Sequence, residues 1–193
     1  TDVDQDGWID LLLVGEFMPI TYFKNKEGKS FEKIERASLA HSSGWWNSIT
    51  AGDFDRDGDM DYIAGNLGLN SRYKGTAKEP LCINANDYDK NGSVDPVMSM
   101  YLHGEKQVAH SWDDLVRQMT PIRARFRTYD PYAKANFENS FLPEEIAASY
   151  QVCSEWFETS YLENKGNGNF VITPLPVQLQ FSPVYGVVVG DYN

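Results

Sequence analysis

The sequence predicts an all-β chain made of repeated units of about four short strands, with one helical insertion. Three observations support this prediction: an aspartate-rich motif recurs in the same register, short apolar runs follow each copy, and one segment carries the start and stop signals of helices. The chain has 193 residues, 41% of them hydrophobic and 23% charged, which is ordinary for a folded protein with a core.

The net charge of the chain is −11, from 28 acidic and 17 basic residues. This charge disfavours general binding to nucleic acids and to anionic membrane surfaces. The longest apolar runs, such as VYGVVV at residues 184–189, are too short to cross a bilayer. We therefore expect neither nucleic-acid binding nor direct membrane insertion.

The motif D-x-D-x-[DN]-G-x-x-D occurs three times, beginning at Asp2, Asp53 and Asp87, and a fourth copy starts at Asp191 and stops at Asn193. Oxygen atoms at the first, third and fifth positions of such a loop can point inward, the glycine allows a sharp turn, and the carbonyl group of the seventh residue adds a ligand, as in calcium loops. The acid that would close the shell is the ninth residue, and runs typical of strands lie on both sides. Each copy is therefore predicted to be a calcium loop between β-strands.

The predicted metal ligands come from every copy of the motif. They are Asp2, Asp4, Asp6, Trp8 and Asp10 in the first, Asp53, Asp55, Asp57, Asp59 and Asp61 in the second, Asp87, Asp89, Asn91, Ser93 and Asp95 in the third, and Asp191 and Asn193 in the truncated fourth. The expected cofactor is structural Ca²⁺ in up to three complete sites and one truncated site, the third being weakest because Asn91 replaces a carboxylate. Asp and Gly also form ordinary turns, but three copies in one register favour a metal loop.

The residues GDFDRDGDMDYIAGNLG (52–68), together with SYLENKGNGNF (160–170) and ITYFKNKEGKSFEKI (20–34), resemble the FG-GAP or VCBS repeat. The pair AGNLGLNSRYKG (64–75) and DYDKNGSVDPV (87–97) is similar, more closely, to bacterial VCBS-repeat proteins of the ASPIC/UnbV group, common in Bacteroidetes. The resemblance implies a β-propeller with a calcium loop in each blade, as in integrin α-chain heads and many secreted bacterial proteins. It also implies an extracellular, periplasmic or outer-membrane-attached location.

Residues 1–193 are accordingly expected to be a fragment of one β-propeller domain with about three four-stranded blades. The approximate repeats are residues 1–52, 53–86 and 87–190, and the other blades are expected in the same longer chain because repeat units need neighbours. The predicted strands lie at residues 10–17, 20–26, 31–37, 48–52, 62–65, 80–87, 95–104, 156–164, 169–177 and 185–193, and residues 43–52 are predicted to cross to the next loop.

The helical insertion is predicted at about residues 110–151. Ser111 and Asp114 form an N-cap pair before an apolar helical pattern that Pro121 ends, while Asp130-Pro131 and Pro143 predict two further helix starts. The sequence leaves two alternatives for Cys82 and Cys153, a disulfide bond in an oxidising compartment or two buried thiols.

No catalytic residue is predicted. HSWDD at residues 110–114 brings His, Ser and Asp together, but a triad is assembled in space and not in sequence. Paired carboxylates for glycoside hydrolysis could come from Glu144, Glu145, Glu155 and Glu158, and an anion site from Arg117, Arg123, Arg125 and Arg127, although solvated surfaces explain both sets.

Candidate ligand contacts are Trp45, Trp46, Arg72 and Tyr73, because an exposed aromatic ring can bind a sugar or a protein. The alternative for the two tryptophans is that their rings seal the space between blades. The sequence therefore predicts a calcium-stabilised propeller module that binds a glycan or a protein. The alternatives are a calcium-dependent polysaccharide lyase or hydrolase and an integrin-like adhesion module, and a binding role is favoured over an enzymatic one.

Overall fold

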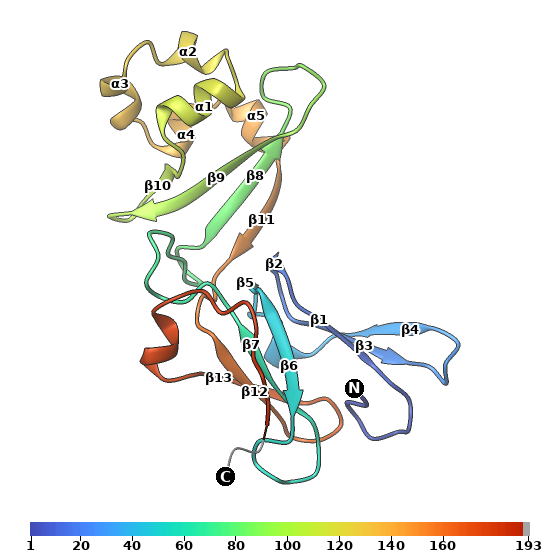
Figure 1. Cartoon of the computed structure of the whole chain (residues 1–193). Helices are drawn as coiled ribbons and strands as arrows, with labels where there is room; N and C mark the ends of the chain where they lie inside the picture. The colour runs from blue at the N-terminus through green and yellow to red at the C-terminus, as the bar shows by residue number, and fades with distance from the viewer. Residues whose placement is uncertain (191–193) are drawn as a thin grey trace. The chain divides into compact units, whose positions relative to one another are not determined.

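The computed structural model describes residues 1–190 and divides into two compact units (Figure 1). Unit 1 is formed by Thr1–Arg72 and by the chain from Ser154 onward, and unit 2 by Tyr73–Cys153. Strands predominate and the helices are short, which confirms the all-β prediction. Within residues 1–190 the sheets do not close into a barrel or a propeller. None of the helices in this range has the length and apolar character needed to cross a bilayer.

The first sheet of unit 1 follows the first aspartate loop. It contains, in spatial order, the antiparallel strands β1 (Leu11–Leu13), β3 (Thr21–Asn25) and β4 (Phe31–Ile34). The strand predicted at residues 10–17 is divided, because β2 (Glu16–Met18) leaves this sheet and pairs with β5 (Gly44–Trp45). Phe17, in the middle of β2, has a φ of 55°, outside the range of regular strands, and the register of β2 on β5 is irregular there.

The second sheet of unit 1 is assembled from two distant parts of the chain. Its antiparallel order is β13 (Phe170–Pro174), β12 (Ser160–Asn164), β7 (Asp61–Gly65) and β6 (Ser48–Gly52). Unit 2 is thus inserted between the second and third strands of a four-stranded sheet. The bounds of the predicted repeats stay a prediction, but β12 and β13, from the repeat predicted at residues 87–190, lie in one sheet with β6 and β7 and not with β9. The reason is burial, since Tyr62 and Leu162 lie opposite each other across β7 and β12 and both are buried.

The two sheets of unit 1 share one hydrophobic core. Tyr22 of β3 and Tyr62 of β7 both contact the ring of Phe170 edge-on, with ring centroids 6.4 and 5.9 Å apart. Trp46 and Leu162 belong to the same cluster of buried side chains. Two short 3₁₀ helices, η1 (Ala37–Leu39) and η2 (Val177–Gln180), complete the regular structure of this unit. Burial of the large rings between the sheets removes apolar area from water and stabilises their packing.

Residues 183–190 run beside β6 without forming a strand. The Val184 N–H donates to the carbonyl oxygen of Asn66 (3.0 Å), and the hydroxyl groups of Ser48 and Thr50 donate to the carbonyl oxygens of Val184 (3.2 Å) and Val187 (3.3 Å). The prediction of a strand at residues 185–193 is wrong for residues 185–190, because side-chain hydroxyl groups and not a backbone ladder hold this segment. Asp191 and Asn193 lie outside the described residues.

Unit 2 consists of a four-stranded sheet and five short helices. The sheet order is β10 (Glu105–Val108), β9 (Asp95–Leu102), β8 (Leu81–Asn86) and β11 (Tyr150–Ser154), whose last residue belongs to unit 1. The helices are α1 (Trp112–Gln118), α2 (Ile122–Arg125), α3 (Tyr129–Ala133), α4 (Phe137–Ser140) and α5 (Pro143–Ala147). Leu115 of α1, Met119 directly after α1 and Phe137 of α4 join Val97 of β9 in one buried cluster.

The helices of unit 2 begin where capping chemistry is available. The Ser111 hydroxyl oxygen accepts the Asp114 N–H (3.2 Å) and caps α1, and Pro143 is the first residue of α5, both as predicted. The start predicted at Asp130-Pro131 comes two residues too late, because α3 begins at Tyr129 behind the N-cap Thr128. The four-residue helices α2 and α4 are too short to give a periodic pattern in the sequence.

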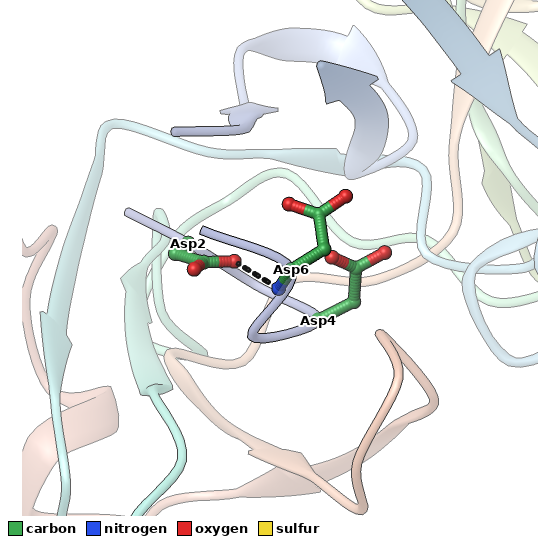
Figure 2. A group of neighbouring side chains, drawn as sticks. All are labelled: Asp2, Asp4 and Asp6. Atoms are coloured by element: carbon green, nitrogen blue, oxygen red, sulfur yellow. Dashed lines mark hydrogen bonds between the residues drawn. The ribbon is translucent and has the colours of Figure 1, made fainter. Parts of the chain in front are cut away.

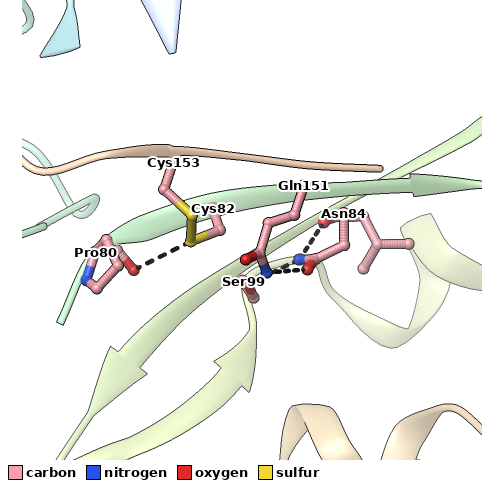
Figure 3. The surroundings of a disulfide bond; sticks show 7 residues. Pro80, Cys82, Asn84, Ser99, Gln151 and Cys153 are labelled. Atoms are coloured by element: carbon pink, nitrogen blue, oxygen red, sulfur yellow. Dashed lines mark hydrogen bonds between the residues drawn. A yellow bond between two sulfur atoms is a disulfide. The ribbon is translucent and has the colours of Figure 1, made fainter. Parts of the chain in front are cut away.

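Cys82 and Cys153 form a disulfide bond between β8 and β11 of unit 2 (Figure 3). A buried amide network lies beside it. The Asn84 amide group donates to Ser99 Oγ (2.9 Å) and to the carbonyl oxygen of Val97 (3.2 Å), and it accepts a hydrogen bond from Gln151 Nε2 (2.7 Å). The disulfide and this network join the strands at the start and the end of unit 2, which settles the alternative that the sequence left open.

The double variant Cys82→Ser/Cys153→Ser should lower the free energy of unfolding of unit 2 by about 4 kcal/mol, because the bond closes a loop of 71 residues in the unfolded chain. Urea unfolding followed by the fluorescence of Trp112, the one tryptophan in residues 73–153, measures this loss. Added reductant should destabilise the wild type and leave the double variant unchanged. Equal midpoints for wild type and variant would contradict the role given to the bond.

Candidate metal centre

The three aspartate motifs form loops of the same backbone conformation, named here loop 1 (residues 2–10), loop 2 (residues 53–61) and loop 3 (residues 87–95). Loop 1 leads into β1, loop 2 connects β6 to β7, and loop 3 connects β8 to β9. The fourth residue of each loop has a positive φ, 60° at Gln5, 64° at Arg56 and 60° at Lys90. The glycines at the sixth position have φ of 90°, 95° and 88°. Since left-handed non-glycine residues are uncommon, this recurrence indicates one tightly wrapped loop used three times.

Each loop brings carboxylate oxygens together. Asp2, Asp4 and Asp6 each offer one oxygen within 4.8 Å of the others, and Figure 2 shows these three side chains around the turn of loop 1. The groups that converge in the other loops are Asp53, Asp55 and Asp57 in loop 2 and Asp87, Asp89 and Asp95 in loop 3. The first, third and fifth positions of the motif thus converge in loops 1 and 2, and the first, third and ninth in loop 3, and each group could hold a metal ion.

The first aspartate of loops 1 and 3 also shapes its own loop. The Asp2 carboxylate accepts the N–H groups of Asp6 (3.2 Å) and Gly7 (2.8 Å). Asp87 accepts the equivalent N–H groups of Asn91 (3.0 Å) and Gly92 (2.8 Å). These bonds use part of each carboxylate and leave lone pairs that can face a cation.

Two buried carboxylate oxygens in the described chain have no hydrogen-bond partner, Asp4 Oδ1 in loop 1 and Asp59 Oδ1 in loop 2. Burial and the neighbouring charge of Asp57 raise the pKa of Asp59 to about 6, and burial raises the pKa of Asp55 as well. A buried, unpaired carboxylate oxygen is costly unless a cation or a proton accompanies it. The oxygen-only donor sets and these two atoms fit a hard divalent cation such as Ca²⁺.

The ninth residue of each loop is a buried aspartate that binds the chain itself. Asp61 is fully buried and accepts three hydrogen bonds, from the Phe54 N–H (3.3 Å), the Tyr161 hydroxyl (2.6 Å) and the Asn164 N–H (2.9 Å). These bonds join the loop to β12, the strand beside β7. The carboxylate of Asp61 therefore already has a structural role in the absence of a metal.

Asp10 repeats this arrangement in loop 1. It accepts hydrogen bonds from the Val3 N–H (3.0 Å), the Tyr22 hydroxyl (3.0 Å) and the Asn25 N–H (2.7 Å). Burial, followed by the bond to the carboxylate, raises the pKa of the Tyr22 hydroxyl and keeps it a donor. In loop 3 the buried Asp95 accepts the Tyr88 N–H (3.1 Å). A metal-ligand role for Asp10, Asp61 and Asp95 stays a prediction.

Loops 1 and 2 are neighbours within unit 1. Gln5 Nε2 donates to the carbonyl oxygen of Gly58 (3.1 Å), and Asn164 Nδ2 donates to the carbonyl oxygen of Val3 (2.8 Å). The hydroxyl groups of Thr1 and Tyr62 are also hydrogen-bonded. Loop 1 and the residue before it are therefore held against loop 2 and against β7 and β12.

The seventh residues of the loops, predicted to act through their carbonyl groups, differ in their side chains. The exposed ring of Trp8 lies against the backbone of Gly28 in the β3–β4 turn, where an added Cβ atom would lie 3.0 Å from the ring. Asp59 is half-buried and Ser93 is exposed. The ligand role of these three residues remains a prediction.

The predicted ligand-contact residues differ in exposure. Trp46 is 2% exposed and its indole N–H donates to the carbonyl oxygen of Ser42 (2.8 Å), so its ring belongs to the core, which corrects its place among exposed contacts. Trp45 is half-buried against Phe17, with ring centroids 5.3 Å apart. Arg72 is exposed and Tyr73 half-buried, and the boundary between the two units falls between them.

The residues weighed for other chemistry make local contacts. Arg125 forms a two-point ion pair with Glu145 (2.8 and 2.5 Å), and His41 lies 3.2 Å from Glu155. The Asp114 carboxylate accepts the Ser111 hydroxyl in the helix cap of α1. These contacts give the side chains named in this paragraph a structural role.

The residues that donate hydrogen bonds to the ninth-position aspartates were not predicted from the sequence. Lys24, whose ammonium group contacts loop 1, was not predicted either. Lys24 Nζ pairs with Asp4 and lies 2.7 Å from Asp6 Oδ2. A signal was present, because TYFKN at residues 21–25 and SYLEN at residues 160–164 share the spacing Y-x-x-N that supplies the hydroxyl and backbone donors.

Residues 2–64 match the FG-GAP-like repeat family. This segment contains loops 1 and 2 and every strand from β1 to β7 except the final residue of β7. The match supports the resemblance to FG-GAP and VCBS repeats and suggests a repeat-containing binding or scaffold module. No curated protein and no solved structure matches the chain.

Asp61→Ala should lower the free energy of unfolding by roughly 3 kcal/mol or more, because it leaves the buried N–H groups of Phe54 and Asn164 without an acceptor. Tyr161→Phe, which removes one hydrogen bond to the same carboxylate, should cost only about 1 kcal/mol. Urea unfolding with and without Ca²⁺ measures both losses.

The loss caused by Asp61→Ala should be present in chelator as well as in calcium, because the hydrogen bonds form without a metal. A loss seen only in the presence of Ca²⁺ would instead assign Asp61 to the metal shell and contradict the role in strand attachment.

Proposed function

We propose that the chain is part of a calcium-stabilised β-propeller that serves as a binding or scaffold module of a secreted or surface-attached bacterial protein. The observation that carries the proposal is the threefold use of one loop conformation with converging carboxylates. The match of residues 2–64 to the FG-GAP-like repeat supports it independently. The proposal includes a relationship to VCBS-repeat proteins of the ASPIC/UnbV group, which rests on sequence resemblance.

Calcium would be held by Asp2, Asp4 and Asp6 in loop 1, by Asp53, Asp55 and Asp57 in loop 2, and by Asp87, Asp89 and Asn91 with Asp95 in loop 3. A bound dication would supply positive charge among carboxylates that otherwise repel each other at these separations. The unpartnered oxygens of Asp4 and Asp59 support this assignment. Because the ion would bind only the folded loops, its binding free energy would add to the stability of the fold.

The propeller proposal rests on the sheets of unit 1. The sheet β13-β12-β7-β6 has the four antiparallel strands of a propeller blade, and β1-β3-β4 has three strands in the equivalent order. The two sheets pack through one core, as neighbouring blades do. We propose that they are adjacent blades, with further blades supplied by the same longer protein.

The disulfide bond and the repeat type support the proposed compartment. Cys82 and Cys153 form a disulfide bond, and such bonds persist in oxidising compartments. FG-GAP repeats are typical of extracellular domains, and residues 2–64 match this repeat. These observations support an extracellular, periplasmic or outer-membrane-attached protein.

Chelation should lower the melting temperature by roughly 5–10 °C, since a ligand at one hundred times its Kd stabilises a folded protein by about 2.7 kcal/mol per site. Differential scanning calorimetry in EDTA and then in excess Ca²⁺ measures the loss and its recovery. Asp53→Asn/Asp55→Asn/Asp57→Asn serves as the matched variant, and its response to Ca²⁺ should be smaller than that of the wild type. A melting curve that EDTA leaves unchanged would refute the calcium proposal.

The proposed ligand of the assembled surface is a glycan or a protein, and a binding module should retain it without changing it. A panel of polysaccharides passed over the immobilised chain should show calcium-dependent retention of at least one class. No new reducing ends or unsaturated products should appear in the eluate. Release of such products would favour the polysaccharide-degrading alternative, and absence of retention across the panel would leave a protein as the proposed ligand.

A further inference from the structure

The two loops of unit 1 face equivalent positions on their neighbouring strands. In the first sheet Leu11 lies opposite Phe23, and in the second Tyr62 lies opposite Leu162. Because Leu11 and Tyr62 each follow the ninth residue of a loop, Phe23 and Leu162 are equivalent. The hydrogen bonds agree, since Tyr22 and Tyr161 precede these residues and both donate to the ninth-position aspartate.

This equivalence pairs two residues of opposite charge. The residue after Phe23 is Lys24, and the residue after Leu162 is Glu163. The next residues, Asn25 and Asn164, donate their N–H groups to Asp10 and Asp61 and fix the same register on both strands. The sheets therefore place an ammonium group beside loop 1 where they place a carboxylate beside loop 2.

The Lys24 ammonium group lies between the carboxylates of loop 1. It forms ion pairs with Asp4 and with Asp6, the latter at 2.7 Å, and its side chain is 24% exposed. The hydrogen bond from Lys24 holds the pKa of the Asp6 carboxyl below its usual range. Loop 1 thus already has a cation among two of the three carboxylates that converge there.

Loop 2 has a different electrostatic environment. Glu163 stands at the strand position that Lys24 occupies beside loop 1. The ion pair of Lys165 is with Glu163, and within the described residues no lysine or arginine forms an ion pair with Asp53, Asp55 or Asp57. Loop 2 therefore keeps an excess of negative charge that loop 1 has partly neutralised.

We infer that Lys24 acts as an internal cation of loop 1, so that loop 1 binds Ca²⁺ much more weakly than loop 2, and that the Lys24/Glu163 pair sets this difference. The inference rests on the proposed calcium function. Ca²⁺ can enter loop 1 only when it displaces the ammonium group from Asp4 and Asp6, whereas loop 2 offers its carboxylates together with the field of Glu163. Loop 1 keeps its fold at calcium concentrations too low to fill it, and loop 2 depends on the ion.

Loop 1 contains its own optical probe. Trp8 is the one tryptophan in the three loops, and its ring is exposed at the seventh position of loop 1. A Tb³⁺ ion, which takes the same oxygen ligands as Ca²⁺, emits when a nearby indole ring transfers energy to it. Tb³⁺ emission excited through Trp8, displaced by titrated Ca²⁺, therefore reports the calcium affinity of loop 1, and Trp8→Phe is the control that should remove the signal.

The test uses reciprocal substitutions in the full chain. Lys24→Gln should tighten Ca²⁺ binding at loop 1 roughly tenfold, and Lys24→Glu, which copies loop 2, roughly a hundredfold, as expected for the loss or reversal of one charge about 4 Å from the ion. Glu163→Lys should weaken Ca²⁺ binding at loop 2, which is expected to be the tighter site in a calorimetric titration. Lys33→Gln is the matched charge control, because it removes a lysine of β4 that forms an ion pair with Glu35. It should change the Ca²⁺ affinity of either loop less than twofold.

Two results would overturn the inference in different ways. If Lys24→Gln and Lys24→Glu both leave the affinity of loop 1 within twofold of wild type while loop 2 binds Ca²⁺, the role of Lys24 is wrong and the calcium function stands. If no loop binds Ca²⁺ in any variant, both fail together. Melting temperatures in saturating Ca²⁺ within a few degrees of wild type show that the variants are folded.

Discussion

The buried carboxylate that ends each aspartate loop of unit 1 is the contact on which the rest of that unit depends. The Asp61 carboxylate accepts a hydrogen bond from an N–H group of its own loop. It also accepts one from a hydroxyl group and one from an N–H group of the neighbouring strand. Asp10 does the same in the first sheet. An ionised carboxylate can accept all three bonds because it has four lone-pair positions and no donor. One side chain thereby fixes the loop, the strand after it and the register of the next strand.

This arrangement concentrates charge. The ninth residue is a buried aspartate, and the first, third and fifth residues of loops 1 and 2 place carboxylate oxygens within 4.8 Å of one another. The repulsion in such a loop is relieved only by positive charge, since water screens the carboxylates incompletely at these separations. In loop 1 an ammonium group from the adjacent strand lies among the carboxylates, whereas in loop 2 the proposal assigns this role to a bound dication.

The loops could be predicted from the sequence because their conformation is set by nine consecutive residues, including a glycine with positive φ. The helix starts at Ser111 and Pro143 could be predicted for the same reason, because each depends on neighbouring residues. The partnership of β7 with β12 could not be predicted, because it depends on the burial of Tyr62 against Leu162, 100 residues apart. The contact of Lys24 with Asp4 also needs the register of β1 on β3, although the pattern Y-x-x-N in both neighbouring strands carried part of that information.

The insertion of unit 2 also determines the order in which contacts can form. The end of β7 and the start of β12 are separated by 95 residues along the backbone, so the central pairing of the second sheet closes a very long loop. Once Cys82 and Cys153 are joined, the shortest covalent path between these strands is about 25 residues, which lowers the entropic cost of closure by about 1 kcal/mol. Oxidation of one thiol pair in the inserted unit thus makes a sheet in the other unit easier to complete, and assembly of that sheet becomes coupled to the redox state of the compartment where the chain folds.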